Sequence, residues 1–150
     1  MNSSVGEHKR EDLIGTWKLV SASSVTSKGN RDDTPYGTNP TGFLTYTPDG
    51  SVTALIGYGG RKPLPFGGGT QEDKAAAFES FLAYAGRFVL ETDKVIHTIE
   101  VSSIQNYVGK ELVRTVRLEE NRLTLTTPPT PVNGKVQKIE LIWERASASH

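Results

Sequence analysis

The sequence predicts an all-β protein, a single closed antiparallel barrel of about eight strands with one short capping helix. Alternating apolar runs lie near both ends of the chain, at residues 13–20 and 139–145. Short alternating runs separated by turn residues fill most of the region between them, and helical spacing is convincing only near residues 70–85. Because a barrel loses its free edges only when its last strand pairs with its first, we expect those two end runs to pair.

Composition favours one soluble domain. The 150 residues are 35% hydrophobic and 23% charged, which is typical of a globular protein, and 17 basic residues balance 17 acidic ones. A balanced charge predicts neither a nucleic-acid surface nor a polybasic membrane patch, and the absence of cysteine excludes disulfides and thiolate metal sites. We expect a polar tail at 1–12, the barrel at 13–146 and a short tail at 147–150. No signal peptide or membrane span is apparent, so we expect a cytoplasmic protein. We also expect a monomer or a homodimer.

Turn residues divide the chain into its expected strands. Pro48, Asp49 and Gly50 form the clearest signal, a tight hairpin turn with glycine in the left-handed position. A second turn signal lies at Asn133-Gly134. The expected strands span residues 15–23, 42–47, 51–58, 87–90, 95–102, 108–118, 122–127 and 136–145. Trp17 would plug the barrel floor, and Arg145 would lie across its indole.

The expected helix follows a glycine- and proline-rich loop at residues 57–69. Thr70 is a suitable N-cap, and Gly86 is suited to the position just after the helix. Phe78, Phe81 and Leu82 recur at helical spacing, so we expect this stripe to seal one end of the barrel. The loop and the helix together would form a lid over that mouth.

Several short motifs resemble those of the lipocalin-like domain family of small bacterial and fungal proteins. The motifs are LIGTWKLV at 13–20, NPTGFLTYTPDG at 39–50, FLAYAGRF at 81–88, VIH at 95–97, NYVG at 106–109, LTLTTPP at 123–129 and WER at 143–145. The resemblance implies a calycin-type barrel that binds small apolar or amphipathic molecules. It also implies that some members are cofactor-free cyclases or isomerases of secondary metabolism. This chain departs from the family pattern at Gln105 and Tyr107, where proline and tryptophan are frequent.

His97 is the first candidate for chemistry, because His8 and His150 lie in the tails. It alternates with Val95, Ile99 and Val101, so we expect it on the inner face, where an imidazole with a pKa near 6.5 suits proton transfer. The alternative is a neutral core histidine bonded to a neighbouring strand. A three-histidine metal site is not expected, and neither is a P-loop or a serine triad.

Arginines and aromatic residues supply the other candidates. Arg114 and Arg87 would need a carboxylate or a ligand oxygen inside a barrel, with Glu100 or Glu111 as internal partners; the alternative is a surface position. Tyrosines offer an apolar wall and one hydrogen-bond donor. We expect His97, Arg114, Tyr84 and Tyr107 as catalytic residues, with substrate contacts from Tyr46, Tyr58, Arg87, Phe81 and Trp143. Simple packing is the alternative for each aromatic residue.

The leading functional hypothesis is a cofactor-independent cyclase or isomerase that acts on a hydrophobic polyketide- or terpenoid-like metabolite inside the barrel. Its alternative is a non-catalytic carrier of a small apolar ligand, which needs the same cavity but no proton-transfer group. A third possibility is a filled barrel that serves only in structure or interaction. The partner in the first two cases is a small hydrophobic molecule, with no cofactor and no metal.

Overall fold

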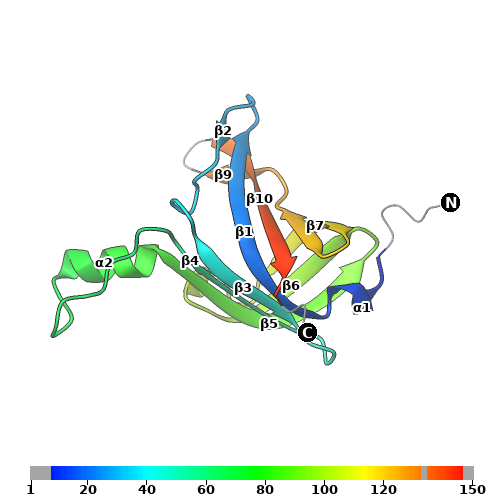
Figure 1. Ribbon diagram of the computed structural model, residues 1–150, viewed down its shortest axis with the longest axis horizontal. Coiled ribbons are helices and arrows are strands. Elements are labelled where there is room, and N and C mark those ends of the chain that lie inside the picture. Colours follow the sequence, from blue (N-terminus) through cyan, green and yellow to red (C-terminus); the bar gives the residue numbers. More distant parts are fainter. Residues whose placement is uncertain (1–7, 133–134, 147–150) are drawn as a thin grey trace.

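Eight strands close into one antiparallel barrel in the computed structural model, which describes residues 8–132 and 135–146 (Figure 1). The ring runs in the order β1 (Gly15–Thr26), β3 (Thr41–Tyr46), β4 (Ser51–Gly57), β5 (Phe81–Glu91), β6 (Lys94–Ser102), β7 (Glu111–Glu119), β8 (Arg122–Thr126) and β10 (Lys135–Arg145). β10 pairs back with β1, and Trp17 lies opposite Arg145. The predicted all-β barrel closed by its end strands is therefore confirmed.

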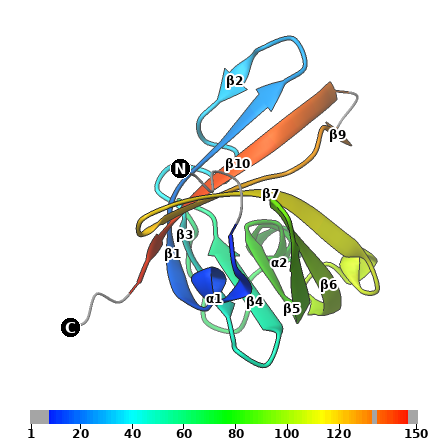
Figure 2. The same cartoon turned by 90° about the vertical axis from the view of Figure 1, so that its right-hand side faces the viewer.

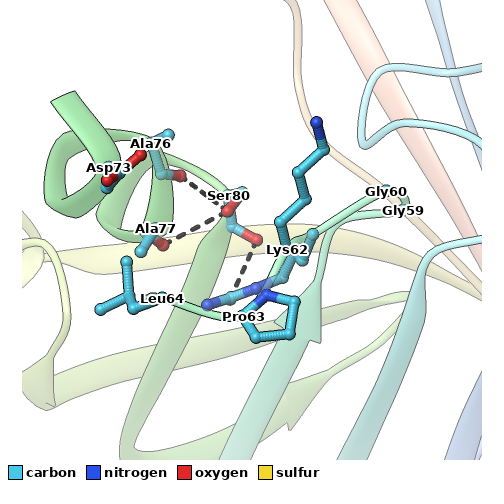
Figure 3. Close-up of a pocket in the computed structure, with 10 residues that line it drawn as sticks. Gly59, Gly60, Lys62, Pro63, Leu64, Asp73, Ala76, Ala77 and Ser80 are labelled. Atoms are coloured by element: carbon cyan, nitrogen blue, oxygen red, sulfur yellow. Dashed lines mark hydrogen bonds between the residues drawn. The ribbon is translucent and has the colours of Figure 1, made fainter. Parts of the chain in front are cut away.

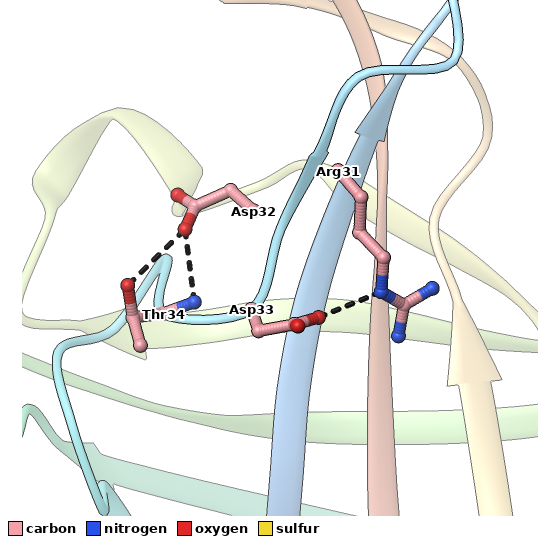
Figure 4. A network of polar contacts seen from close by, with 4 residues as sticks. All are labelled: Arg31, Asp32, Asp33 and Thr34. Carbon is pink, nitrogen blue, oxygen red and sulfur yellow. Dashed lines mark hydrogen bonds and ion pairs between the residues drawn. The ribbon is translucent and has the colours of Figure 1, made fainter.

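Two short strands extend the barrel at one end. β2 (Arg31–Asp32) pairs with β1, and β9 (Thr130–Val132) pairs with β10, so both lie at the top of Figure 1 and stand out again in Figure 2. The loop after β2 is held by local contacts (Figure 4): Asp32 accepts hydrogen bonds from the Thr34 amide and hydroxyl, and Arg31 pairs with Asp33 at 2.6 Å. This ordered turn leads the chain to Tyr36.

The other end of the barrel is closed by side chains. A short helix, α1 (Arg10–Leu13), precedes β1 within the segment expected to be a tail, and Leu13 is fully buried. The Trp17 Nε1 donates to the Leu13 carbonyl at 3.0 Å, and the Arg145 guanidinium lies 4.2 Å from the centre of the indole ring. Trp17 therefore plugs the floor as predicted, and Arg145 covers it.

The single longer helix, α2 (Gln71–Glu79), is shorter than expected. Thr70 caps it as predicted, accepting a hydrogen bond from the Asp73 amide at 3.1 Å. The helix ends at Glu79 because the next residues form β5, in which Phe81 lies opposite Gly57 of β4. Cross-strand pairing has overridden the helical spacing of Phe78, Phe81 and Leu82. No α2 side chain is buried, and the helix projects beyond the ends of β4 and β5 (Figure 1), so the expected sealing stripe does not form.

Gly86 has a different role from the one predicted. It lies within β5, opposite Ile99, while Ala85 lies opposite Val101, so Glu100 is an extra residue in a β-bulge. A Cβ at Gly86 would lie 1.9 Å from the Thr98 carbonyl oxygen, which only glycine avoids. The bulge also resets the alternation of β6. Val95, His97 and Ile99 are buried, whereas Val101 is 62% exposed, so its expected inner position is wrong.

The remaining sequence expectations concern the hairpin turn, the second turn signal with the two tails, and membrane-spanning segments. The hairpin at Pro48–Gly50 is confirmed, with the Gly50 amide bonded to the Thr47 carbonyl at 3.0 Å and a positive φ at glycine. The Asn133-Gly134 turn lies outside the described residues, as do residues 1–7 and 147–150 of the predicted tails and His150. Within the described residues, no helix combines the length and the apolar character needed to cross a membrane.

Candidate functional site

A cavity of about 390 Å³ opens at the end of the barrel opposite Trp17. We call it the Tyr84–Arg114 cavity. Its wall is mostly apolar or aromatic and comes from β5, β7, β9, β10 and the connections that follow β2, β6 and β8. It consists of Tyr36, Leu82, Tyr84, Tyr107, Glu111, Leu112, Val113, Arg114, Thr127, Pro128, Thr130, Gln137 and Ile139. A concave, largely apolar site with a few polar groups is typical of a small-molecule pocket.

Arg114 is the principal charged group of the cavity wall. It lies on β7 between the inward positions of Leu112 and Val116, and its side chain is half-buried. Its Nη1 donates to the Val113 carbonyl at 2.9 Å, and no carboxylate among the described residues forms an ion pair with it. Glu111 lines the same cavity but is exposed, so the predicted internal pairing with Glu111 or Glu100 is wrong. Most of the five guanidinium N–H donors remain available.

His97 lies beneath the cavity rather than in its wall. Only 1% of its surface is exposed, and both ring nitrogens are bonded to tyrosines. Tyr46 Oη lies 2.7 Å from Nε2, and Tyr84 Oη lies 2.7 Å from Nδ1. Burial, helped by the nearby charge of Arg114, lowers the pKa of His97 to about 3. The imidazole is therefore neutral at physiological pH, far from the unperturbed pKa on which its proposed acid–base role depends.

Tyr84 connects the buried histidine to the cavity. It is in the middle of β5, opposite Ala54 of β4, and only 8% of its surface is exposed. Burial raises its pKa to about 12, so the phenol is protonated. Tyr36, whose pKa burial also raises to about 12, lines the same cavity and contacts Tyr58 with ring centres 5.0 Å apart. The polar groups of the cavity wall thus include neutral hydroxyls, the Gln137 amide and the Arg114 guanidinium, together with the exposed carboxylate of Glu111.

The structure brings together some of the predicted site residues and separates others. Arg114, Tyr84 and Tyr107 line the cavity, and Tyr46 and His97 lie directly behind Tyr84. Trp143 is a core residue, 1% exposed. Arg87 is exposed on β5. Phe81 lies on the outside of the barrel, with the Arg61 Cζ 5.1 Å from the centre of its ring. Tyr58 contacts Tyr36 rather than the cavity itself.

Sequence reasoning missed several wall residues. Tyr36 lies in the connection between β2 and β3, and Leu82 lies in the segment expected to be helical, yet both line the cavity. The signal for Tyr36 is its position between the first and second long strands, since that connection must cross the same barrel end as the one that contains Tyr107. None of residues 57–80 lines the cavity, so the expected lid over the mouth is absent from this arrangement. The helix α2, which belongs to this segment, projects instead beyond the ends of β4 and β5 (Figure 1).

A second hollow, of about 340 Å³, lies between the glycine-rich loop and α2 (Figure 3). The chain itself bonds several of the polar groups of this hollow. Ser80 Oγ donates to the Ala76 carbonyl at 2.7 Å, and Arg61 donates to the Ser80 carbonyl at 3.4 Å. Asp73 accepts from the Thr70 amide. Arg61 and Lys62 also line the hollow, and within residues 8–132 and 135–146 no cluster suited to a metal ion is found.

Comparison with known proteins identifies the family. The lipocalin-like domain family matches residues 14–146. This chain belongs to that family. It is 35% identical over 86 residues to the 4'-hydroxy-3'-methoxypropiophenone carrier protein ppsC of Aspergillus oryzae (strain ATCC 42149 / RIB 40), an alignment that covers 51% of this chain and 78% of that protein.

A solved structure is also similar to this lipocalin-like chain. It is a lipocalin-like protein from Bacteroides uniformis ATCC 8492, with 17% sequence identity and a TM-score of 0.47. The match covers 89% of this chain and 98% of that one. The resemblance inferred from the short sequence motifs is confirmed by the family match.

Proposed function

We propose that this protein binds and carries a small aromatic molecule with an oxygen acceptor, held in the Tyr84–Arg114 cavity. The observation that carries the proposal is the guanidinium of Arg114, half-buried in an apolar wall and without a carboxylate partner among the described residues. Because a buried charge is costly unless it is hydrogen-bonded, such a group favours a ligand that brings its own oxygen.

The size and the lining of the cavity support a single-ring ligand. A volume of about 390 Å³ is at the lower end of the usual range for small-molecule sites. Tyr36 and Tyr107 offer ring faces or edges to an aromatic ligand, and Leu82, Leu112 and Ile139 offer aliphatic surface. The related protein from Aspergillus oryzae is named as the carrier of an aryl ketone, and a ligand of that class would meet both the aromatic wall and the guanidinium.

The binding function is better supported than catalysis. A cyclase or isomerase that works by proton transfer needs a group that exchanges protons near neutral pH, and a pKa of about 3 makes His97 a weak base that is not protonated to the imidazolium at that pH. The high pKa values of Tyr36 and Tyr84 keep both phenols protonated, so neither supplies a phenolate base near neutral pH. Enzymatic turnover of a polyketide- or terpenoid-like metabolite therefore stays a prediction, tested by whether a bound compound is recovered chemically unchanged.

The direct test is titration with 4'-hydroxy-3'-methoxypropiophenone, measured by isothermal calorimetry. We expect Arg114→Met to lower the affinity by roughly 10-fold or more, because a hydrogen bond from a charged donor is lost. Arg117→Met is the matched control, since Arg117 is on the same strand with an exposed side chain and only a 3.9 Å pair with Glu119. The proposal is overturned if the wild-type protein does not bind the ketone, or if Arg114→Met binds it equally well.

A further inference from the structure

The buried end of the cavity contains a three-residue hydrogen-bonded chain that the binding function has not yet used. Tyr46 from β3, His97 from β6 and Tyr84 from β5 are joined by two contacts of 2.7 Å, one at each ring nitrogen. Tyr46 and His97 are both 1% exposed, and Tyr84 has one side against the cavity. The direction in which hydrogen bonds run along this chain decides what Tyr84 offers to a ligand.

A neutral imidazole has one N–H donor and one acceptor nitrogen. Burial and the charge of Arg114 keep His97 neutral, as its lowered pKa indicates. Its two tyrosine partners must therefore play opposite roles: one donates to the bare nitrogen, and the other accepts from the N–H. Either the chain runs from Tyr46 toward Tyr84 or it runs in the reverse direction.

The surroundings of Tyr46 favour one direction. Its hydroxyl is buried, and within residues 8–132 and 135–146 its only hydrogen-bond partner is His97 Nε2. If Nε2 carried the hydrogen, the Tyr46 hydroxyl hydrogen would have no acceptor in a dry core, which costs the full desolvation of a donor. If Tyr46 donates to Nε2, the hydroxyl hydrogen of Tyr46 and the N–H hydrogen of His97 are both satisfied, because Nδ1–H then donates to the oxygen of Tyr84.

We propose that Tyr84 is the ligand-selecting donor of the cavity, and that the buried Tyr46–His97 pair keeps its hydroxyl hydrogen free for a carbonyl oxygen of the ligand. This inference rests on the binding function proposed above and narrows its ligand class. The Tyr84 oxygen accepts a hydrogen bond from Nδ1–H. The hydrogen of the Tyr84 hydroxyl is therefore not needed for the hydrogen bond to His97. A phenol whose oxygen already accepts a hydrogen bond is also a stronger donor, because hydrogen bonds in a series polarise one another.

Arg114 complements this donor. It lines the same cavity as Tyr84, and its charge acts on Tyr84, Tyr46 and His97. A carbonyl oxygen has two lone pairs, so it can accept from a phenol and a guanidinium together. The site thus selects for a neutral ketone or ester oxygen over a ligand whose corresponding group is a hydrocarbon. A ligand that is purely apolar would leave both donors without a partner, which disfavours its binding.

The first test reads the tautomer of His97 in the ligand-free protein by ¹⁵N NMR of the imidazole, with the signal assigned by its loss in His97→Gln. We expect the hydrogen on Nδ1 and a bare Nε2. In Tyr46→Phe, Nε2 no longer receives a hydrogen bond from Tyr46, so both tautomers become populated. The ¹⁵N chemical shifts of Nδ1 and Nε2 should then move toward each other. A hydrogen on Nε2 in the wild-type protein overturns the inference, and so does an unchanged tautomer in Tyr46→Phe.

The second test compares two ligands that differ in one oxygen, 4'-hydroxy-3'-methoxypropiophenone and 2-methoxy-4-propylphenol, in which a methylene replaces the carbonyl. We expect the wild-type protein to prefer the ketone and Tyr84→Phe to reduce that preference roughly 5- to 10-fold, the worth of one hydrogen bond. The methylene compound controls within each variant for any change in folding or cavity shape. The inference requires that Tyr84→Phe lower the affinity for the methylene compound much less than the affinity for the ketone.

The outcomes separate the two proposals. Equal affinity of the wild-type protein for both compounds overturns the role of Tyr84 but leaves the binding function standing. An unchanged preference in Tyr84→Phe does the same. If the wild-type protein binds neither compound, the binding function itself fails for this ligand class, and the donor role of Tyr84 fails with it. The Nδ1–H tautomer is then still decided by the NMR measurement.

Discussion

An arginine lies at each end of the barrel, and the two are bonded in different ways. At the floor, Arg145 donates to the Ile14 carbonyl at 2.9 Å and the Asp12 carbonyl at 2.8 Å, and its guanidinium covers Trp17. At the cavity, Arg114 donates to the carbonyl of its own neighbour, Val113, and among the described residues it has no other hydrogen-bond partner. Arg145 is thus bonded to parts of the chain more than a hundred residues away, whereas the one bond of Arg114 is local.

The same contrast extends to the aromatic residues of the two ends. Trp17 is fully buried, and its indole nitrogen is bonded to the chain. Tyr36 and Tyr107 are only partly buried and border open space. At the floor, Trp17 and Arg145 are thus hydrogen-bonded to the chain, although the nearby Trp143 Nε1 is buried without a partner among the described residues, whereas at the mouth Tyr36, Tyr107 and Arg114 border open space. This difference distinguishes Arg145, which is bonded to the chain, from Arg114, for which we propose a role in ligand binding, although the sequence alone does not separate the two arginines.

The largest effect on stability is expected for Arg145→Met. The variant loses two hydrogen bonds from a charged donor and the contact with the indole, so the free energy of unfolding should fall by about 2–3 kcal/mol. Urea denaturation followed by tryptophan fluorescence measures the change.

Arg122→Met is the matched control for that variant. Arg122 pairs with Glu144 at 3.2 Å, but both side chains are at least half exposed, so the pair should contribute less than about 1 kcal/mol. Equal losses in the two variants would contradict the structural role given to Arg145. A loss in Arg114→Met as large as that in Arg145→Met would remove the distinction between the two ends.

The pH dependence of stability tests the buried histidine. Its pKa is about 3 in the folded protein and about 6.5 when unfolded, so the unfolded state binds more protons between these values. The free energy of unfolding should therefore fall as pH falls below about 6.5, by up to about 1.4 kcal/mol per pH unit. Urea midpoints between pH 6.5 and 4.5 measure this slope.

His97→Gln is the control for the pH experiment, because the variant cannot bind the extra proton. Its slope should be shallower than that of the wild-type protein over the same pH interval. Parallel slopes would mean that His97 is not held neutral by burial, and the argument for a single N–H on the ring would lose its support. Asp49, whose pKa is lowered mainly by the hydroxyl of Thr47, affects stability only at lower pH and does so in both proteins.

The sequence predicted the barrel because its signals are local and repeated. The Pro48–Gly50 turn, the alternating strands and the Trp17–Arg145 pair each depend on a few residues, and all are found in the structure. The fate of residues 80–86 was not predictable in this way. They have helical spacing, but pairing with β4 decides their conformation, and that partner is more than twenty residues away.

The candidate site was predicted only in part, for a similar reason. Alternation predicts the inward position of His97, which is buried, but for Arg114 it leaves an inner and a surface position open. Alternation cannot tell which end of the barrel is filled and which is open, so it could not distinguish the buried Tyr46 and Trp143 from the cavity wall. The β-bulge at Glu100 also shifted Val101 outward, and no single residue in β6 marks it.

The smallest effect is expected for Phe78→Ser on α2. Phe78 is 57% exposed, and no side chain of this helix is buried, so the free energy of unfolding should change by no more than about 0.5 kcal/mol. Affinity for the aryl ketone should also stay unchanged, because the cavity wall contains no α2 residue. Leu82→Ala is the informative comparison, since the sequence placed both residues on one stripe, but Leu82 lines the cavity and its loss should weaken binding. A marked loss of affinity in Phe78→Ser would mean that α2 closes over the mouth when ligand binds, and the contrast between a closed floor and an open mouth would then hold only for the empty protein.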